Sequence, residues 1–181
     1  MGREHRNRKE KGNSTDSRCC KLRKAQRPRT VSLIVQGCCF EIKSEVIEHL
    51  TTYAQHEGNE LCGVLTGSQI GENVYRISKV SPPCVAKNSR CGCERDAAKA
   101  NAFIKKDYGD SERTRAYIGE WHTHPEYHPT PSGTDYRSII HNYQTSELAF
   151  PFLVMIIVGT KSIYSCVYNG QLFNETPFII R

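Results

Sequence analysis

Residues 120–135 read Glu-Trp-His-Thr-His-Pro-Glu-Tyr-His-Pro-Thr-Pro-Ser-Gly-Thr-Asp, and this stretch decides how the rest of the chain is interpreted. His122 and His124 lie two residues apart at the end of a strand expected over 116–121. Because side chains alternate along a strand, both imidazoles point to the same side, roughly 6–7 Å apart along the backbone. Asp135 follows at the start of the next expected helix, so a returning loop can bring its carboxylate to the same point.

Two histidines and one carboxylate are a known ligand set for catalytic zinc. Such a set leaves one coordination position for water, whose pKa the metal lowers toward about 7. A His-x-His pair alone is a weak signal, since two surface histidines can arise at this spacing by chance. The addition of Ser132-x-x-Asp135 after a gap of seven residues makes the pattern far more specific.

The whole string resembles the JAMM motif of the MPN/Mov34 metalloprotease family, in which His-x-His is followed by seven residues, Ser, two residues and Asp. Residues 122–124, 125–131 and 132–135 supply these parts with no spacing error. The family also places a glutamate just before a Gly-containing strand, and residues 60–67 (Glu-Leu-Cys-Gly-Val-Leu-Thr-Gly) look like that element. The resemblance covers roughly residues 38–170. It implies the JAMM/MPN α/β fold, which is related to cytidine deaminases and has a mixed sheet flanked by helices.

The resemblance also implies a mechanism. His122, His124 and Asp135 would hold Zn²⁺, and Glu60 would take a proton from the zinc-held water and return it to the leaving amine. The hydroxyl of Ser132 would help to stabilise the oxyanion. The pseudo-enzymes of the family lose metal ligands, and none is lost here, so an active zinc metalloprotease is expected.

Apolar periodicity independently predicts a mixed α/β order in one domain over residues 30–181. A Cys-rich loop is expected over 84–93, a turn over 68–72, and a final strand pair after Asn169-Gly170. Ser44 is expected to cap the first helix. Strands are expected over 31–35, 39–42, 61–66, 74–80, 116–121, 152–158 and 163–168, and helices over 44–56, 94–107 and 132–143.

The net charge of +6 is unevenly distributed. Residues 1–30 carry eleven Lys/Arg and three Asp/Glu, which leaves fourteen against sixteen for the remainder of the chain. Residues 1–29 have almost no apolar side chains, so a disordered basic arm is expected, either merely solvated or weakly binding nucleic acid. No apolar run is long enough to span a membrane and no secretory signal is visible, so a cytoplasmic protein is expected.

Nine cysteines without a secretion signal are expected to be free thiols. Three cysteines within ten residues, Cys84, Cys91 and Cys93, are candidates for a second, structural zinc, but a Cys-x-x-Cys pair is missing and loop thiols are favoured. Cys62 is expected to be a small core residue.

Three other residues near the motif have alternative interpretations. His128 is a candidate third imidazole ligand, although Asp135 fits the family pattern better. Glu120 is either a partner of a metal ligand or a surface charge. Trp121 either packs behind the metal site or grips substrate. A metallo-β-lactamase site is not favoured, since its His-x-His continues with x-Asp-His, whereas Pro125-Glu126-Tyr127 follows here.

JAMM enzymes often cleave isopeptide bonds formed by ubiquitin-like tails, and such an extended tail can pair with a sheet edge. Family members carry substrate-binding insertions where residues 82–115 lie. Residues 117–126 and 129–132 are similar to the stand-alone JAMM peptidases of CBASS anti-phage operons. That similarity implies an isopeptidase acting on the conjugated C-terminus of a cGAS-like nucleotidyltransferase (CD-NTase). Two alternatives remain: a hydrolase for a sulfur-carrier or other ubiquitin-like protein, and a non-catalytic MPN scaffold.

Overall fold

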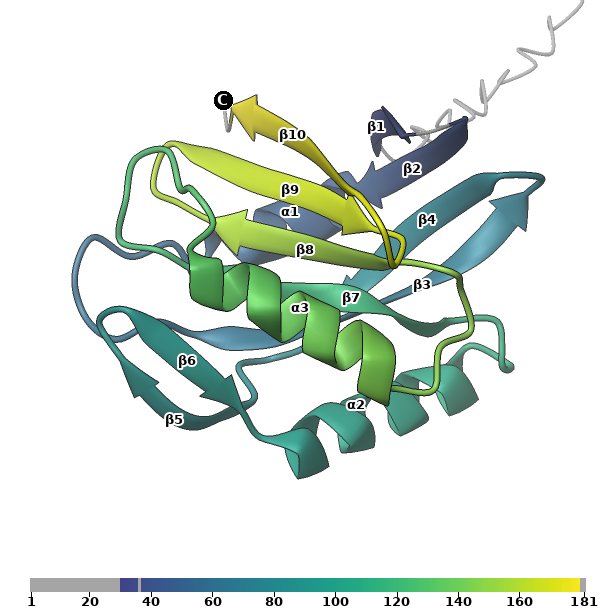
Figure 1. Cartoon of the computed structure of the whole chain (residues 1–181). Coiled ribbons are helices and arrows are strands. Elements are labelled where there is room, and N and C mark those ends of the chain that lie inside the picture. The colour runs from purple at the N-terminus through teal and green to yellow at the C-terminus, as the bar shows by residue number, and fades with distance from the viewer. Residues whose placement is uncertain (1–29, 36, 180–181) are drawn as a thin grey trace, which may run out of the picture.

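A computed structural model describes residues 30–35 and 37–179, so the basic arm expected over 1–29 lies outside the described residues. One eight-stranded sheet forms the centre of the domain (Figure 1). Neighbouring strands are antiparallel except for the parallel pairs β2–β4 and β7–β8. In spatial order the strands are β1 (Thr30–Val35), β2 (Cys38–Lys43), β4 (Val74–Val80), β3 (Cys62–Gly71), β7 (Ala116–Thr123), β8 (Leu153–Val158), β9 (Ser162–Tyr168) and β10 (Phe173–Ile179).

Three helices cover the two faces of this sheet (Figure 1). Helix α1 (Ser44–Thr51) packs on one face, and helices α2 (Ala97–Asp110) and α3 (Gly133–Thr145) pack on the other. A separate hairpin of β5 (Val85–Ser89) and β6 (Gly92–Arg95) precedes α2. None of the helices in the described part of the chain is long and apolar enough to cross a membrane.

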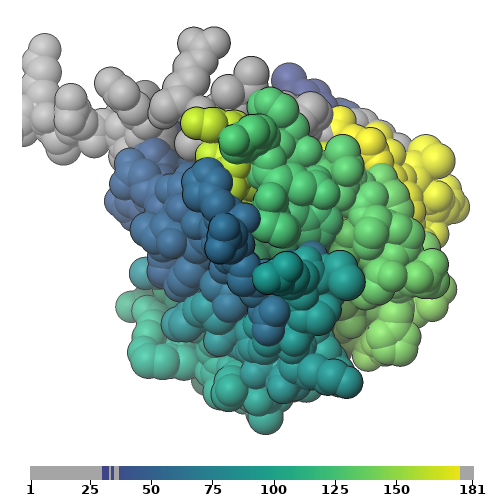
Figure 2. Space-filling model, turned by 90° about the vertical axis from the view of Figure 1, so that its left-hand side faces the viewer, coloured from purple at the N-terminus to yellow at the C-terminus, as the bar shows by residue number. Residues whose placement is uncertain are grey.

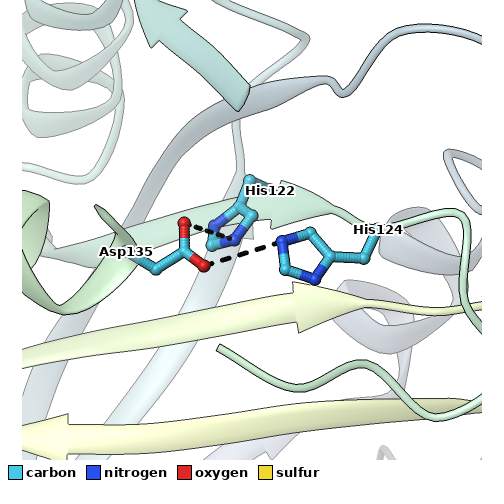
Figure 3. A group of neighbouring side chains, drawn as sticks. All are labelled: His122, His124 and Asp135. Carbon is cyan, nitrogen blue, oxygen red and sulfur yellow. Dashed lines mark ion pairs between the residues drawn. The ribbon is translucent and has the colours of Figure 1, made fainter. Parts of the chain in front are cut away.

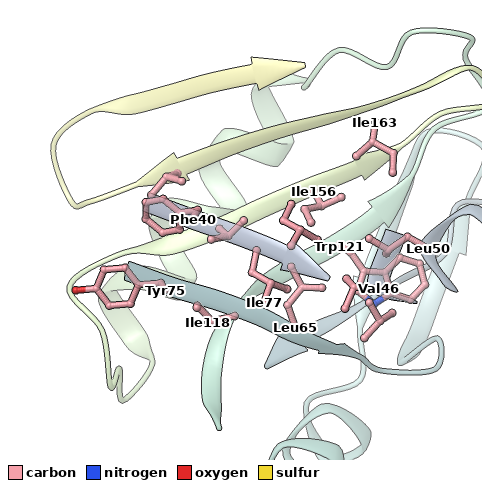
Figure 4. Close-up of a cluster of buried hydrophobic side chains, with 14 of the residues drawn as sticks. Phe40, Val46, Leu50, Leu65, Tyr75, Ile77, Ile118, Trp121, Ile156 and Ile163 are labelled. Carbon is pink, nitrogen blue, oxygen red and sulfur yellow. The ribbon is translucent and has the colours of Figure 1, made fainter. Parts of the chain in front are cut away.

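Strand β8 shows why the sheet needs cover on both sides. Its sequence Leu-Val-Met-Ile-Ile-Val is buried at every position, as expected for a central strand with helices on both faces. The α1 face of the core is drawn in Figure 4 and includes Phe40, Leu50, Leu65, Ile77, Trp121 and Ile156. The opposite face includes Val64, Ala100, Tyr117, Ile139, Leu153 and Ile157.

The predicted mixed α/β fold is confirmed, but several predicted elements were wrong in detail. Helix α1 ends at Thr51 rather than near residue 56. Its N-cap is Lys43, without a side-chain hydrogen bond, so Ser44 does not cap it. Strand β3 continues through Gly71, which includes most of the turn predicted over 68–72, because β4 supplies a partner that far.

Three elements after residue 83 also differ from the prediction. The Cys-rich segment over 84–93 is not a loop, since most of it forms the β5–β6 hairpin. Helix α2 begins later than predicted because the Asp96 carboxylate caps it, accepting the N–H groups of Ala98 and Lys99. A single strand, β10, follows Asn169-Gly170 and pairs with β9, where a strand pair was expected.

Gly119 is required by the close approach of β7 and β8. A Cβ at this position would lie 2.1 Å from the Val154 carbonyl oxygen. We therefore expect Gly119→Ala to lower the free energy of unfolding by about 3 kcal/mol, since neither backbone can move without breaking the ladder. Gly109→Ala is the matched control, because a Cβ there meets nothing within 4 Å. Urea denaturation of both variants checks this, and equal stabilities would contradict it.

Candidate metal centre

The predicted ligands meet where β7 ends and α3 begins (Figure 3). The backbone register places His122 opposite Cys62 of β3 on one side and Ile157 of β8 on the other. Because side chains alternate, His124 projects to the same side as His122. Asp135 reaches both: its Oδ1 lies 3.4 Å from His122 Nε2 and its Oδ2 lies 3.6 Å from His124 Nε2.

A capping box orients the Asp135 carboxylate. Ser132 is the N-cap of α3, and its hydroxyl oxygen accepts the Asp135 N–H at 3.2 Å. In return, the Ser132 N–H donates to Asp135 Oδ2 at 2.6 Å. Burial alone would raise the pKa of Asp135, but the neighbouring His122 imidazole and the Ser132 N–H hold it well below its usual range. The carboxylate therefore stays ionised and fixed.

The donor set fits zinc in chemistry and in spacing. The three donor atoms lie within 4.8 Å of one another. Ligands about 2.0–2.2 Å from a tetrahedral zinc are roughly 3.3 Å apart, close to the separations from Asp135 to the two imidazoles. His122 Nε2 is buried and has no hydrogen-bond partner among the described residues, as expected for an atom reserved for a metal. Burial lowers the pKa of His124, which keeps it in the neutral form that binds metals.

Glu60 lies just before β3 and faces this cluster. It is 5% exposed, and its Oε1 is 3.8 Å from His124 Nε2. The β5–β6 hairpin holds the backbone of Glu60 through two hydrogen bonds of 2.8 Å. The Glu60 N–H donates to the Ser89 carbonyl, and the Glu60 carbonyl accepts from Asn88 Nδ2. Burial raises the pKa of Glu60 to about 7, against a smaller lowering by His122. A carboxyl group with this pKa can both accept and release a proton near neutral pH.

The raised pKa of Glu60 predicts how the metal-free protein responds to pH. Between its ordinary pKa of 4.5 and about 7, the carboxyl group ionises in the unfolded chain but not in the folded one. Its contribution to stability is therefore complete below pH 4.5 and is lost as pH rises through 7, by about 3 kcal/mol in all. Urea denaturation of metal-free wild type and Glu60→Gln from pH 5 to 8 isolates this contribution. A stability difference that does not change with pH would contradict it.

A cavity of about 430 Å³ opens beside the cluster and is lined by Glu60, His122 and Asp135. Figure 2 shows the face where the segment before β3, the β5–β6 hairpin and the segment after β7 lie side by side. Cys93 also lines this cavity, as do two residues that were not singled out from the sequence, Arg95 and Asn142. Arg95 and Asn142 lie in polar segments with no local motif, so no sequence signal marks them.

The alternative candidates near the motif have different surroundings. His128 is not part of the donor group, and its Nδ1 lies 3.0 Å from Ser162 Oγ. Trp121 is fully buried and stacks on Tyr53 with ring centroids 4.7 Å apart, which favours packing behind the site. Glu120 is not a surface charge, because its side chain is only 13% exposed.

The predicted free thiols are consistent with the structure. Every cysteine within 30–35 and 37–179 is free. Cys84 is buried and Cys91 is exposed, and the described residues hold no second cluster of metal-binding side chains. The suggestion of a structural zinc at Cys84, Cys91 and Cys93 therefore has no support in the described chain.

A mixed sheet that presents two histidines and an aspartate beside a buried glutamate defines a metalloprotease of the JAMM class. The chain belongs to the family described as prokaryotic homologs of the JAB domain, whose pattern matches residues 43–169. The family resemblance predicted from the sequence is thus confirmed.

Relatives in several bacteria share most of the domain. The chain is 31% identical over 129 residues to a protein of Vibrio cholerae named CD-NTase/cGAS isopeptidase, covering 70% of this chain and 80% of the relative. It is 32% identical over 126 residues to the Escherichia coli protein of the same name, covering 68% and 78%. A Desulfitobacterium hafniense protein solved in solution shares the fold, with a TM-score of 0.55 and 22% identity over 75% of this chain and 88% of that chain.

Proposed function

We propose that this protein is a zinc-dependent isopeptidase that hydrolyses the amide bond between the C-terminus of a CD-NTase and its target in bacterial anti-phage defence. The observation that carries the proposal is the buried Glu60 carboxylate facing the His122, His124 and Asp135 donor set. The names of the Vibrio cholerae and Escherichia coli relatives support the choice of substrate.

The metal would be held by His122, His124 and Asp135. When bound, zinc supplies Lewis-acid activation of a water molecule and of the scissile carbonyl. The chain itself supplies the proton transfers. Glu60 Oε1 lies 3.8 Å from His124 Nε2, beside the donor set, so it can take a proton there and deliver it to the leaving amine.

Ser132 has two separable roles in this proposal, as the helix cap and as an oxyanion donor. Its oxygen accepts the Asp135 N–H, which leaves the hydroxyl proton free to donate to substrate. We expect Ser132→Gly to lower kcat by about 10²–10³-fold through the lost donor. Its stability should fall by only a few tenths of a kcal/mol, since glycine is a tolerated N-cap.

Ser132→Ala is the companion variant, because alanine loses the cap as well and should cost about 1 kcal/mol more in stability. Steady-state kinetics and thermal denaturation of both variants separate the two roles. A Ser132→Gly enzyme with wild-type kcat would leave Ser132 with the capping role alone.

The substrate tail is proposed to enter beside the β5–β6 hairpin. This hairpin lies within the 82–115 segment, and its backbone already contacts Glu60 through Ser89 and Asn88. An extended C-terminal tail could pair with a hairpin strand and bring its last carbonyl to the metal centre. A reducing, cytoplasmic location is part of the proposal and agrees with the free described cysteines.

The proposal is tested with a CD-NTase joined through its C-terminal residue to a reporter protein. We expect scission at the junction that a chelator blocks and that added zinc restores. Fusions to a sulfur-carrier protein and to a bacterial ubiquitin-like protein run in parallel. Preferential cleavage of either one would overturn the substrate assignment, and no cleavage of any fusion by zinc-loaded protein would favour the scaffold alternative.

A further inference from the structure

We infer that Glu120 is a positioning residue that sets the shape of the substrate groove by tying Arg95 of the β5–β6 hairpin to Asn142 of α3. The inference rests on the proposed function, because it assigns to the groove the tail of the same substrate. It concerns residues that neither bind the metal nor transfer the proton.

Glu120 joins three separate elements through one oxygen atom. Its Oε1 accepts from the Arg95 guanidinium, from the Tyr117 hydroxyl at 2.7 Å and from Asn142 Nδ2 at 2.8 Å. Arg95 ends β6 of the hairpin, Tyr117 belongs to β7, and Asn142 belongs to α3. The carboxylate therefore fixes the distance between the hairpin and α3.

These two donors line more than the metal cavity. A second cavity of about 530 Å³ lies between α2 and α3, and it shares Arg95, Ala97 and Asn142 with the first. The second cavity is lined by apolar side chains such as Val64 and Ile104 and by polar ones such as Asn101 and Lys105. The network around Glu120 thus stands where the two cavities meet, on the route that a tail leading away from the metal would follow.

The metal ligands are held by other means. His122 is fixed by its strand between β3 and β8, and Asp135 is fixed by the capping box with Ser132. Neither ligand has a described hydrogen bond to Glu120. Loss of Glu120 should therefore move the walls of the groove before it disturbs the donor set.

The charge of Glu120 is needed as well as its shape. Burial opposes the charge of Arg95, and the Glu120 carboxylate beside it keeps the pKa of Arg95 above its usual value. In Glu120→Gln the guanidinium would lose its counter-charge while still half-buried, which favours its movement toward water. Arg95→Gln should remove the same ion pair by deleting its cation instead of its anion, so the two substitutions act on one interaction.

The experiment measures tail binding and turnover separately. A fluorescent peptide of about ten residues from a CD-NTase C-terminus is titrated into zinc-loaded Glu60→Gln protein, with and without Glu120→Gln. We expect Glu120→Gln to raise the peptide Kd, and KM on the fusion substrate, about tenfold. We expect kcat to stay within about threefold and the bound zinc to be unchanged, because only the walls move.

Two comparisons exclude a merely structural effect. Asp107→Asn is the matched control, because Asp107 is also a buried carboxylate, accepts from Thr66 and Arg115, and lines neither cavity. It should lower the melting temperature without raising the peptide Kd. The double variant Glu120→Gln/Arg95→Gln should bind the peptide no worse than either single variant, as expected for two partners in one interaction.

Several results would overturn the inference. Unchanged Kd and KM in Glu120→Gln would do so, as would a fall in zinc content that accounts for the loss, since Glu120 would then act on the metal. No peptide binding by the parent protein would also reject the groove. Peptide binding without cleavage of the fusion is a different result: it rejects the proposed function and leaves the groove in place.

Discussion

Glu60→Gln should reduce cleavage by about 10²–10⁴-fold while the protein keeps its fold and its zinc. Glutamine has nearly the same size as glutamate, so the backbone contacts of residue 60 with Ser89 and Asn88 remain. What is lost is a carboxyl group that can accept and release a proton 3.8 Å from His124 Nε2. The measurement is single-turnover cleavage of the CD-NTase fusion by zinc-loaded protein.

Glu94→Gln is the matched control for this result. Glu94 lines the same cavity but is exposed and makes no contact with the donor set. We expect its activity to remain close to wild type. A Glu60→Gln enzyme that cleaves at an undiminished rate would remove Glu60 from the proton transfer.

Asp135→Asn should lower zinc affinity by more than the roughly 10–100-fold lost when an outer partner of a metal ligand is removed. The amide oxygen of asparagine can still accept the Ser132 N–H, so the start of α3 is expected to persist. The lost component is the anionic donor between His122 and His124. Competition with a coloured zinc chelator measures the affinity, and activity should fall with it.

His128→Gln provides the comparison for Asp135→Asn. His128 is close to the motif in sequence, but it lies outside the donor group and faces Ser162. Its removal should leave zinc affinity unchanged. Equal losses in the two variants would mean that the ligand set was assigned wrongly, and tight zinc binding by Asp135→Asn would remove Asp135 from it.

The donor set could be predicted because its geometry is local. Alternation along one strand places the His122 and His124 side chains on the same side. The capping box at the start of α3, between Ser132 and Asp135, orients the Asp135 carboxylate. Both features are visible in sixteen consecutive residues. The mixed sheet could be predicted from the order of the periodic segments. A wholly apolar strand such as Leu153–Val158 has to be covered on both faces, which places it in the middle of a sheet.

The errors occurred where distant contacts decide the structure. Nothing local indicates that the Cys-rich segment pairs with itself as a hairpin and holds Glu60 through Ser89. The burial of Glu120 depends on Arg95 and Asn142, which lie 25 and 22 residues away along the chain. Periodicity predicted a longer first helix because Tyr53 and Ala54 do pack on the core, although from a turn beyond α1.

The central claim is that one zinc ion is held by two imidazoles and an aspartate beside Glu60. Anomalous diffraction from crystals of the zinc-loaded protein, recorded on both sides of the zinc edge, tests it most directly. We expect one strong peak within about 2.0–2.2 Å of donor atoms of His122, His124 and Asp135. A peak on the cysteine thiols instead, or none at these three side chains in active protein, would contradict the account.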